Sequence, residues 1–435
     1  MLTVHFGAFN AEAAWRDPAA ASLPEVQDRQ AQRVVEAMEE VQFALCGDGD
    51  VLLTAREMVP GHREYLASAG FRFEEARAGR WPGARASPYA VVPGVEEICS
   101  RCELAADLPP VEVARKVNSK VYSNGLAAAL ELSGVGEVVR SVEELSASEL
   151  ARGPCIVKDP FGVSGKGSLI VRARSELERL LVHLERQRAA ERFIELLVQP
   201  LYERATDFSC HFEVTREGWR PIGVQVMENE GLAFAAVRPA PRELLELLEA
   251  KGQWRVMERV AGALRRDGYR GPACVDAMVL RDGTLVPLLE INARKSMGLI
   301  NLRLQERTGL SSHLSTMNLS FQRAVAFDEV LGALRRAGLL YEGGSRVGVL
   351  PLSGHAVMAN LPGHDGDTRD GDPRRGGAAQ AAETNRGAAD PVPLRARGRL
   401  YLAALAADQA EADRLIGAVA ACLETLGITA PRRGA

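Results

Sequence analysis

Two carboxylates and an amide fall within one stretch of alternating residues in the second half of the chain. Asp276 lies in an apolar run, and Glu290 and Asn292 end the next run, with an Asp-Gly turn signal between the two. Because side chains alternate along a strand, Glu290 and Asn292 share one face. Three oxygen donors on one face suit a hard cation such as Mg²⁺ that also binds substrate phosphates. The alternative is a solvated hairpin edge.

The register of this hairpin decides whether Asp276 joins the other two residues. A two-residue turn at Asp282-Gly283 would pair Asp276 with Leu289 and turn the Asp276 side chain to the opposite face. The sequence therefore predicts a longer turn or a bulge that keeps all three side chains on one surface.

A glycine-rich loop lies between two short apolar runs that read as strands, 155–158 and 169–171. Closely spaced glycines let backbone N–H groups turn toward a phosphate, and Lys158 and Lys166 add positive charge. It is not a Walker loop, because Gly167 follows Lys166 and no helix begins directly after it. The candidate phosphate-binding residues are Lys158, Gly162, Ser164, Gly165, Lys166, Gly167 and Ser168.

Lysine is scarce, since only six of the 53 basic residues are Lys. In a chain that uses Arg almost everywhere, the few Lys residues indicate places where a compact ammonium is needed; chance clustering under a biased composition is the alternative. Lys116 and Lys120 lie at i and i+4 in a stretch that reads as one helix, 111–134, so both ammonium groups project from one side. This spacing favours an anion nearby; a solvated helix face is the alternative.

A further apolar strand, 193–200, runs into Gln199-Pro200-Leu201-Tyr202, with Asp207 shortly after it. Such a strand end can offer polar groups to a flat base while its apolar residues sandwich the ring. A strand at 221–227 follows, and then a loop at 228–241 that we expect to shape the substrate pockets. Helix 242–267 precedes the hairpin.

The chain has 435 residues, enough for two or three domains. Residues 1–105 alternate strand and helix, which is the pattern of a parallel sheet: strands at 2–6, 50–54 and 71–73, and helices at 23–45 and 62–68. A helix at 327–337, a strand at 347–350, a strand at 400–405 and a helix at 411–426 make a C-terminal α+β segment. Within it, residues 362–398 are poor in large apolar residues and are expected to be disordered.

Composition excludes several classes of protein. The net charge of −4 implies no general polyanion-binding surface, so we expect no nucleic-acid partner. No apolar run is long enough to span a bilayer and the N-terminus lacks a signal-peptide pattern, which predicts a cytoplasmic protein without a membrane partner. Cys99 and Cys102 form one close pair, but we find no second pair or nearby histidines to complete a zinc site.

Taken in order, Lys116, Lys158, the glycine loop, Gln199–Tyr202, Asp276 and Glu290-x-Asn292 resemble the ATP-grasp superfamily of ATP-dependent ligases. The resemblance covers residues 111–303, and the Glu-x-Asn-x-Arg run with its upstream Asp is the most specific part. It implies an α/β and α+β protein in three parts. These are a Rossmann-like pre-ATP-grasp domain (1–105), an ATP-grasp domain (106–320) and a C-terminal segment (321–435).

The resemblance also implies roles for the candidate residues. Lys116 and Lys158 would contact the α- and β-phosphates of ATP, and 162–168 would close over the β/γ end. Gln199, Leu201 and Tyr202 would receive adenine and Asp207 the ribose. Asp276, Glu290 and Asn292 would carry two Mg²⁺ ions. D-Ala–D-Ala ligases have an Arg where this chain has Cys274, so Arg294 is the candidate for steadying the acyl intermediate, with Lys158 as a second catalytic candidate.

The run Asn292–Gly298 and the run Asn118-Ser119-Lys120 look most like peptide and amino-acid ligases of natural-product pathways, of the pheganomycin and butirosin types. The expected activity joins a carboxylic acid, with glutamate among the candidates, to an amine through an acyl phosphate. A carrier-protein thiol is the alternative acceptor, and a non-catalytic ATP-binding regulator is the alternative of another class. The oligomeric state stays open, with a homodimer among the alternatives.

Overall fold

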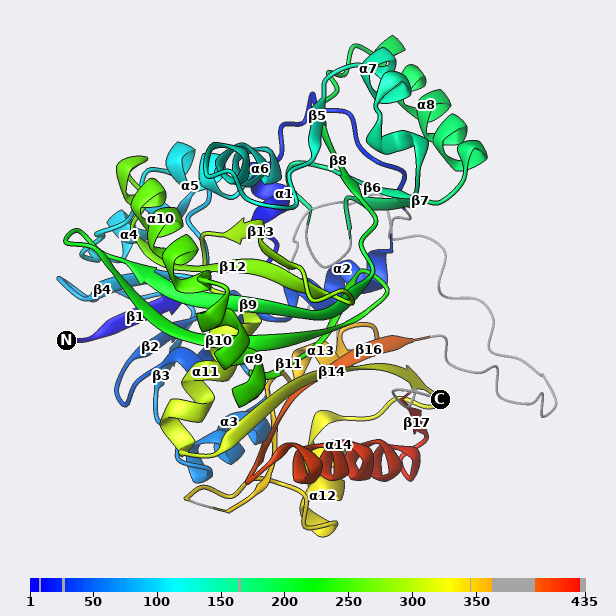
Figure 1. The fold of residues 1–435 in the computed structure, drawn as a ribbon. Helices are drawn as coiled ribbons and strands as arrows, with labels where there is room; N and C mark the ends of the chain where they lie inside the picture. The colour runs from blue at the N-terminus through cyan, green and yellow to red at the C-terminus, as the bar shows by residue number, and fades with distance from the viewer. Residues whose placement is uncertain (8, 26–27, 163–165, 345, 362–395, 431–435) are drawn as a thin grey trace, which may run out of the picture.

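The computed structural model describes residues 1–7, 9–25, 28–162, 166–344, 346–361 and 396–430. The strands of these residues form three sheets. Figure 1 shows the smallest lobe, with α7 and α8, at the top of the view, and the longest strands crossing the centre. No helix within the described ranges is long and apolar enough to cross a membrane.

The N-terminal sheet has the strand order β3-β2-β1-β4 with every pair parallel, which confirms the predicted parallel sheet. Its elements are β1 (Thr3–Phe6), α1 (Ala11–Trp15), α2 (Arg29–Glu36), η1 (Glu39–Leu45), β2 (Val51–Leu53), α3 (Pro60–Ser68), β3 (Glu74–Ala76), β4 (Arg85–Pro88) and α4 (Val95–Arg101). Two predictions were wrong in detail. The helix at 23–45 is two shorter helices that turn apart at Ala37-Met38, and the strand at 71–73 begins only at Glu74. Cys99 and Cys102 are buried in the apolar cluster beside this sheet.

The small sheet is antiparallel, with the order β5-β8-β6-β7, and α7, η2 and α8 pack on its apolar face. Two helices, not one, lead into it. The elements are α5 (Val111–Val117), α6 (Lys120–Ala129), β5 (Glu137–Val139), α7 (Val142–Ala147), η2 (Leu150–Arg152), β6 (Cys155–Lys158), β7 (Ser168–Val171), α8 (Arg174–Ala189) and β8 (Leu196–Pro200).

The large sheet has the order β13-β12-β9-β10-β11-β14-β16-β15, with β17 beside β14. Its strands are β9 (Arg204–Val214), β10 (Trp219–Glu230), β11 (Ala233–Pro239), β12 (Gly271–Leu280), β13 (Leu285–Asn292), β14 (Ser311–Phe321), β15 (Gly348–Pro351), β16 (Arg397–Ala406) and β17 (Ile428–Thr429). The helices of this region are α9 (Arg242–Ala250), α10 (Gln253–Arg266), α11 (Met297–Thr308), α12 (Phe327–Arg336), α13 (His355–Met358) and α14 (Gln409–Glu424).

Three predictions change in this region. The predicted loop at 228–241 is wrong, because β10 continues to Glu230 and turns at Gly231, which has a φ of +64°, directly into β11. The predicted helix at 242–267 is interrupted at Gly252, also left-handed. The predicted disordered stretch at 362–398 lies mostly outside the described residues, but Arg397 and Gly398 already belong to β16. The C-terminal segment thus continues the sheet that carries the acidic residues.

Candidate active site

The β12–β13 hairpin brings Asp276 directly opposite Glu290, and Cys274 opposite Asn292. The connection is longer than two residues, since the Leu280 N–H donates to the Thr284 carbonyl, and the register shifts between Asp276 and Met278. The prediction of a longer turn or a bulge is therefore confirmed, because the hairpin has both a longer turn and a register shift. As a result Asp276, Glu290 and Asn292 lie on the wall of one cavity.

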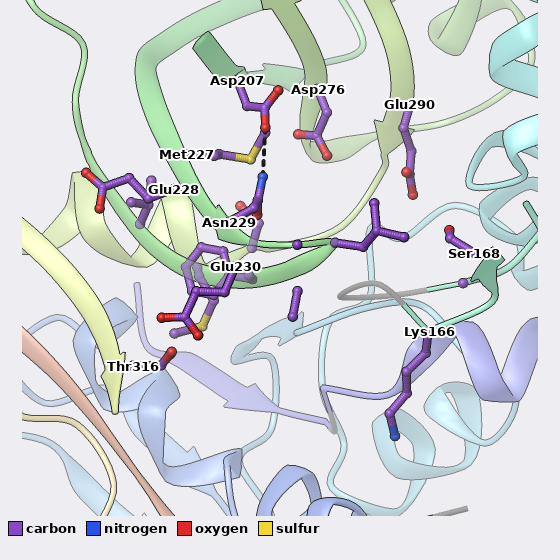
Figure 2. Close-up of a pocket in the computed structure, with 18 of the residues that line it drawn as sticks. Lys166, Ser168, Asp207, Met227, Glu228, Asn229, Glu230, Asp276, Glu290 and Thr316 are labelled. Atoms are coloured by element: carbon purple, nitrogen blue, oxygen red, sulfur yellow. Dashed lines mark hydrogen bonds between the residues drawn. The ribbon is translucent and has the colours of Figure 1, made fainter. Parts of the chain in front are cut away.

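Figure 2 shows Asp276 and Glu290 pointing from neighbouring strands into this cavity, with Ser168 and Lys166 on the facing hairpin. The Asn292 side-chain amide donates to Asp276 Oδ2 at 2.9 Å. Burial, and next the charge of Glu290, raise the pKa of Asp276 to about 7. Two carboxylates held side by side and partly buried are stabilised by positive charge nearby. Their hard oxygens fit Mg²⁺, which proteins usually bind through one or two carboxylates together with substrate phosphates.

Two lysines supply positive charge at the same place. Lys120 is buried, and its Nζ lies 2.8 Å from Glu290 Oε1 and donates to the Gly162 carbonyl at 2.7 Å. Lys158 lines the cavity, and its ammonium forms no ion pair with any described residue. Burial lowers the pKa of Lys158 to about 8, with the charge of Glu290 opposing the shift. An unpaired ammonium in a cavity is suited to binding a phosphate.

Lys116 does not join this group, because the helix predicted at 111–134 ends at Val117. Asn118 uses its side chain to bind the Ala114 carbonyl and the Ala293 N–H, and Ser119 then caps α6. The i, i+4 geometry is thereby lost. Lys116 is mostly exposed and binds Asp267 at 2.8 Å, away from the cavity. Lys120, to which the sequence analysis gave no role in ATP binding, lies beside Glu290 instead. The Asn118-Ser119 pair, which is typical of a helix break followed by a new N-cap, could have indicated this position.

The predicted glycine loop connects β6 and β7, and its described residues Gly162, Lys166, Gly167 and Ser168 line the cavity. Gly167 has a φ of +69°, and an added Cβ would lie 3.1 Å from Asp159 Oδ2, so a side chain is disfavoured there. Lys166 is half exposed and lies 3.8 Å from Glu25. Ser164 and Gly165 lie outside the described residues.

The residues expected around adenine and ribose line the cavity as well, namely Gln199, Leu201, Tyr202 and Asp207. Gln199 donates to the Gly134 carbonyl, while its buried Oε1 has no hydrogen-bond partner among the described residues. Asp207 accepts from the Asn229 side chain at 2.9 Å and pairs with Arg204. The free amide oxygen of Gln199 is an acceptor of the kind an exocyclic amine would use.

Arg294 lies on the wall beside Asn292. Its guanidinium donates to Glu12 at 2.7 Å and to Asn292 Oδ1 at 3.0 Å, and it lies over the Tyr89 ring. Glu12 comes from α1, in the N-terminal part of the chain. Sequence reasoning could not find it, because 282 residues separate it from Arg294.

The cavity has a volume of about 2160 Å³, above the usual 300–1,000 Å³ of a site for one small ligand. It therefore has room for a nucleotide and further substrates. Beyond Arg294 it extends along β11, which lies within the 228–241 segment expected to shape the substrate pockets, and along β14, β16 and α14, where the sequence indicated no functional residues. The polar side chains of this far wall include Arg238, His313, Asn318, Arg399, Gln409 and Asp413.

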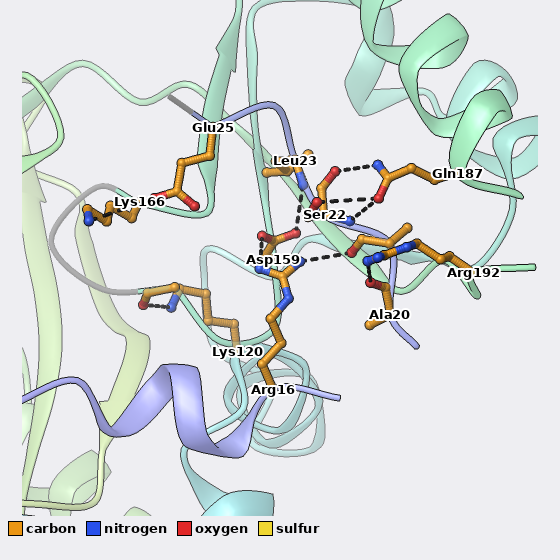
Figure 3. A network of polar contacts seen from close by, with 12 residues as sticks. Arg16, Ala20, Ser22, Leu23, Glu25, Lys120, Asp159, Lys166, Gln187 and Arg192 are labelled. Atoms are coloured by element: carbon orange, nitrogen blue, oxygen red, sulfur yellow. Dashed lines mark hydrogen bonds and ion pairs between the residues drawn. The ribbon is translucent and has the colours of Figure 1, made fainter. Parts of the chain in front are cut away.

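An N-terminal strap, residues 15–23, ties α1 to the small lobe (Figure 3). Arg16 pairs with the buried Asp159 at 3.1 Å and donates to the Ala21 carbonyl. The Ser22 N–H donates to Gln187 of α8, and Ala20 bridges to Phe193. The strap thus fixes the strand end from which the glycine loop departs.

Comparison with solved structures identifies the fold. The chain is 13% identical to N5-carboxyaminoimidazole ribonucleotide synthetase from Thermus thermophilus, with a TM-score of 0.52 over 92% of this chain and 98% of that one. It is 13% identical to an L-amino acid ligase from Bacillus licheniformis, with a TM-score of 0.50 over 100% and 99% of the two chains. The chain has the ATP-grasp fold. The predicted fold class is confirmed.

One sequence relative supports the ATP-grasp assignment. The chain is 22% identical over 196 residues to the butirosin acyl-carrier protein–L-glutamate ligase of Niallia circulans. The match covers 43% of this chain and 45% of that protein, so the chain spans less than half the length of this curated relative. No family model matches the chain.

Proposed function

We propose that this ATP-grasp protein is an ATP-dependent carboxylate–amine ligase that forms ADP. The observation that carries the proposal is the meeting of Asp276, Glu290 and Asn292 with Lys120 and Lys158 on the wall of one cavity, which the glycine loop also lines. Phosphoryl transfer depends mainly on charge neutralisation and alignment, and these residues can supply both.

In the proposed reaction a substrate carboxylate attacks the γ-phosphate of ATP, which gives an acyl phosphate and ADP. An amine then attacks the acyl carbon and phosphate leaves, which gives the amide. Lys120, Lys158 and the glycine loop hold the phosphates, and Arg294 grips the carboxylate and later the developing oxyanion. Two Mg²⁺ ions held by Asp276, Glu290 and Asn292 would neutralise phosphate charge. Gln199, Leu201 and Tyr202 receive adenine and Asp207 the ribose.

The experiment measures ADP release with pairs of amino acids, with glutamate included as donor. We expect release that requires both a carboxylic acid and an amine and stops when EDTA removes Mg²⁺. Glu290→Ala should abolish turnover, while Glu258→Ala, which removes an exposed carboxylate of α10, should not change it. Release of AMP, or full activity of Glu290→Ala, would reject the proposal. ATP binding without any turnover would favour a regulator.

The sequence similarity to a ligase that acts on a carrier protein favours a second acceptor, a carrier-protein thiol. The ATP step stays the same, and the thiolate displaces phosphate to give a thioester. Intact-mass measurement of a phosphopantetheinyl carrier protein after incubation with acid, ATP and this chain separates the two acceptors. A mass increase equal to the acid less water supports the thiol; an unchanged carrier with amide product supports the amine.

A further inference from the structure

A second cavity, of about 970 Å³, lies behind Arg294. Its walls come from β1 and β4 of the N-terminal sheet, the end of η1, the end of β9 and one side of α11. It shares Tyr89 and Arg294 with the catalytic cavity, so these two residues stand between the two spaces.

The second cavity lies beside the N-terminal sheet. Residues that follow the carboxyl end of β1, Phe9 and Asn10, line the catalytic cavity, whereas the second cavity reaches the segments before β2 and β3, residues 46–48 and Gly70. His5 and Ser87, which face each other across β1 and β4, line the second cavity, and residues 89–91 after β4 line it too.

Lys295 is a buried cation in this cavity, with 6% of its surface exposed. Its ammonium donates to the Ser87 carbonyl at 2.7 Å and lies 3.3 Å from His5 Nδ1, and no described carboxylate lies within ion-pair distance of it. Buried lysines are rare unless paired. Burial is the main cause that lowers the pKa of Lys295 to about 7; the charge of Arg85 acts in the same direction, and Cys46 and Asp50 oppose the shift.

Arg85 lines the same cavity and also has no ion pair among the described residues. The acidic residues nearby are mostly engaged elsewhere, since Asp48 binds Arg307 at 2.7 Å and Asp107 binds Arg216 and Arg270. Glu306 pairs with Arg303, and Glu213 with Arg220. The charge of Asp50 also acts on Lys295, but Asp50 pairs with His5 at 3.4 Å and accepts from the Thr3 and Gly47 N–H groups. No described carboxylate therefore forms an ion pair with Lys295 or Arg85.

We propose that the second cavity binds a small oxyanion, a phosphate or a carboxylate, between Lys295 and Arg85. An anion there supplies the missing opposite charge to both cations, and the planar Arg fork and the compact ammonium are the usual partners of such groups. The site is distinct from the phosphate-binding wall around Lys120 and Lys158. It does not depend on the proposed ligase activity.

The test is isothermal titration calorimetry of the full chain in chloride buffer, with inorganic phosphate and succinate as separate probes. We expect saturable binding of at least one probe, weakened at least tenfold by Arg85→Gln and by Lys295→Met. Arg85 is exposed, so Arg85→Gln should fold normally. The test therefore stands even if Lys295→Met, which removes a buried side chain, fails to fold. The two probes distinguish a phosphate ligand from a carboxylate ligand.

Two controls locate the binding. Arg255→Gln removes an exposed positive charge of α10 outside both cavities, and Lys158→Met removes one from the catalytic cavity. Both variants should bind the probe with unchanged affinity. The proposal is overturned if neither probe binds the wild type, if Arg85→Gln binds as tightly as the wild type, or if Lys158→Met alone abolishes binding.

Discussion

Lys116 and Lys120 differ sharply in surroundings although four residues separate them. Lys120 is buried against Glu290 in the cavity, whereas Lys116 forms a surface pair with Asp267. We expect Lys120→Met to lower kcat/KM for ATP by about 10²-fold or more, the loss typical of removing one preorganised charge partner. Lys116→Met should lower it by no more than about the factor of five that a surface ion pair contributes.

Initial rates at varied ATP measure both variants, with thermal unfolding as a check that each is folded. Equal losses in the two variants would show that the ammonium beside Glu290 has no special part in ATP use.

The pKa of Lys158 predicts how ATP use responds to pH. Burial lowers this pKa from 10.5 to about 8, so the ammonium is almost fully charged well below pH 8, is half charged at about pH 8 and loses its charge as the pH rises further. If the charged form binds phosphate, kcat/KM for ATP should fall about tenfold per pH unit above pH 8, since this ratio reports groups of the free enzyme.

A pH series from 6.5 to 9.5 measures this dependence. Lys158→Arg should move the fall upward, because the Arg guanidinium stays charged throughout this range. A profile that is flat to pH 9.5 in the wild type would contradict a role for the Lys158 charge.

At the scale of elements, a substitution in β16 can test whether the C-terminal segment is part of the large sheet. A Cβ on Gly398 would lie 2.0 Å from the Val357 carbonyl oxygen, a backbone atom that cannot move aside. Gly398→Ala should therefore destabilise the protein by about 1–3 kcal/mol. Gly417 in α14 has no atom within 4 Å of an added Cβ, and Gly417→Ala should stabilise by about 0.5–1 kcal/mol.

Urea unfolding of the two glycine variants gives both free energies. If Gly398→Ala has the same free energy of unfolding as the wild type, Gly398 does not lie against the Val357 carbonyl.

The irregular register of the hairpin could be predicted from the sequence, because only such a register places Asp276 on the same face as Glu290. The parallel N-terminal sheet followed from its alternation of strands and helices. By contrast, β14 carries polar side chains such as Ser312, His313 and Ser315 that are buried here, which hid it from a hydrophobicity pattern. The break before Lys120 lay within a helical pattern, and the contact of Glu12 with Arg294 depends on tertiary folding alone.

At the scale of the molecule, the strap joins the N-terminal domain to the small lobe through Arg16 and Asp159. Asp159 is 2% exposed in its side chain, and burial raises its pKa while Arg16 opposes the shift. Arg16→Ala leaves this carboxylate buried and unpaired, which should cost about 1–3 kcal/mol of unfolding free energy. Adding Asp159→Asn should recover part of the loss, because the amide carries no charge.

A double-mutant cycle in urea measures this coupling, and Arg174→Ala, which breaks an exposed pair with Glu178, is the control at about 0–0.5 kcal/mol. Additive losses for Arg16 and Asp159 would show that the strap contact is not energetically coupled.

The large sheet carries the carboxylates at β12 and β13 and, without interruption, the far wall at β14 and β16. Those two sides of the cavity cannot part without breaking ladder hydrogen bonds. Any change in the width of the cavity therefore comes from its other walls, which are α1, α2 and the small lobe. The small lobe leaves the rest of the chain at two places, before β5 and at 201–203. The strap is a third connection between the small lobe and the rest of the molecule, beside these two chain segments, and its length limits how far the lobe can move.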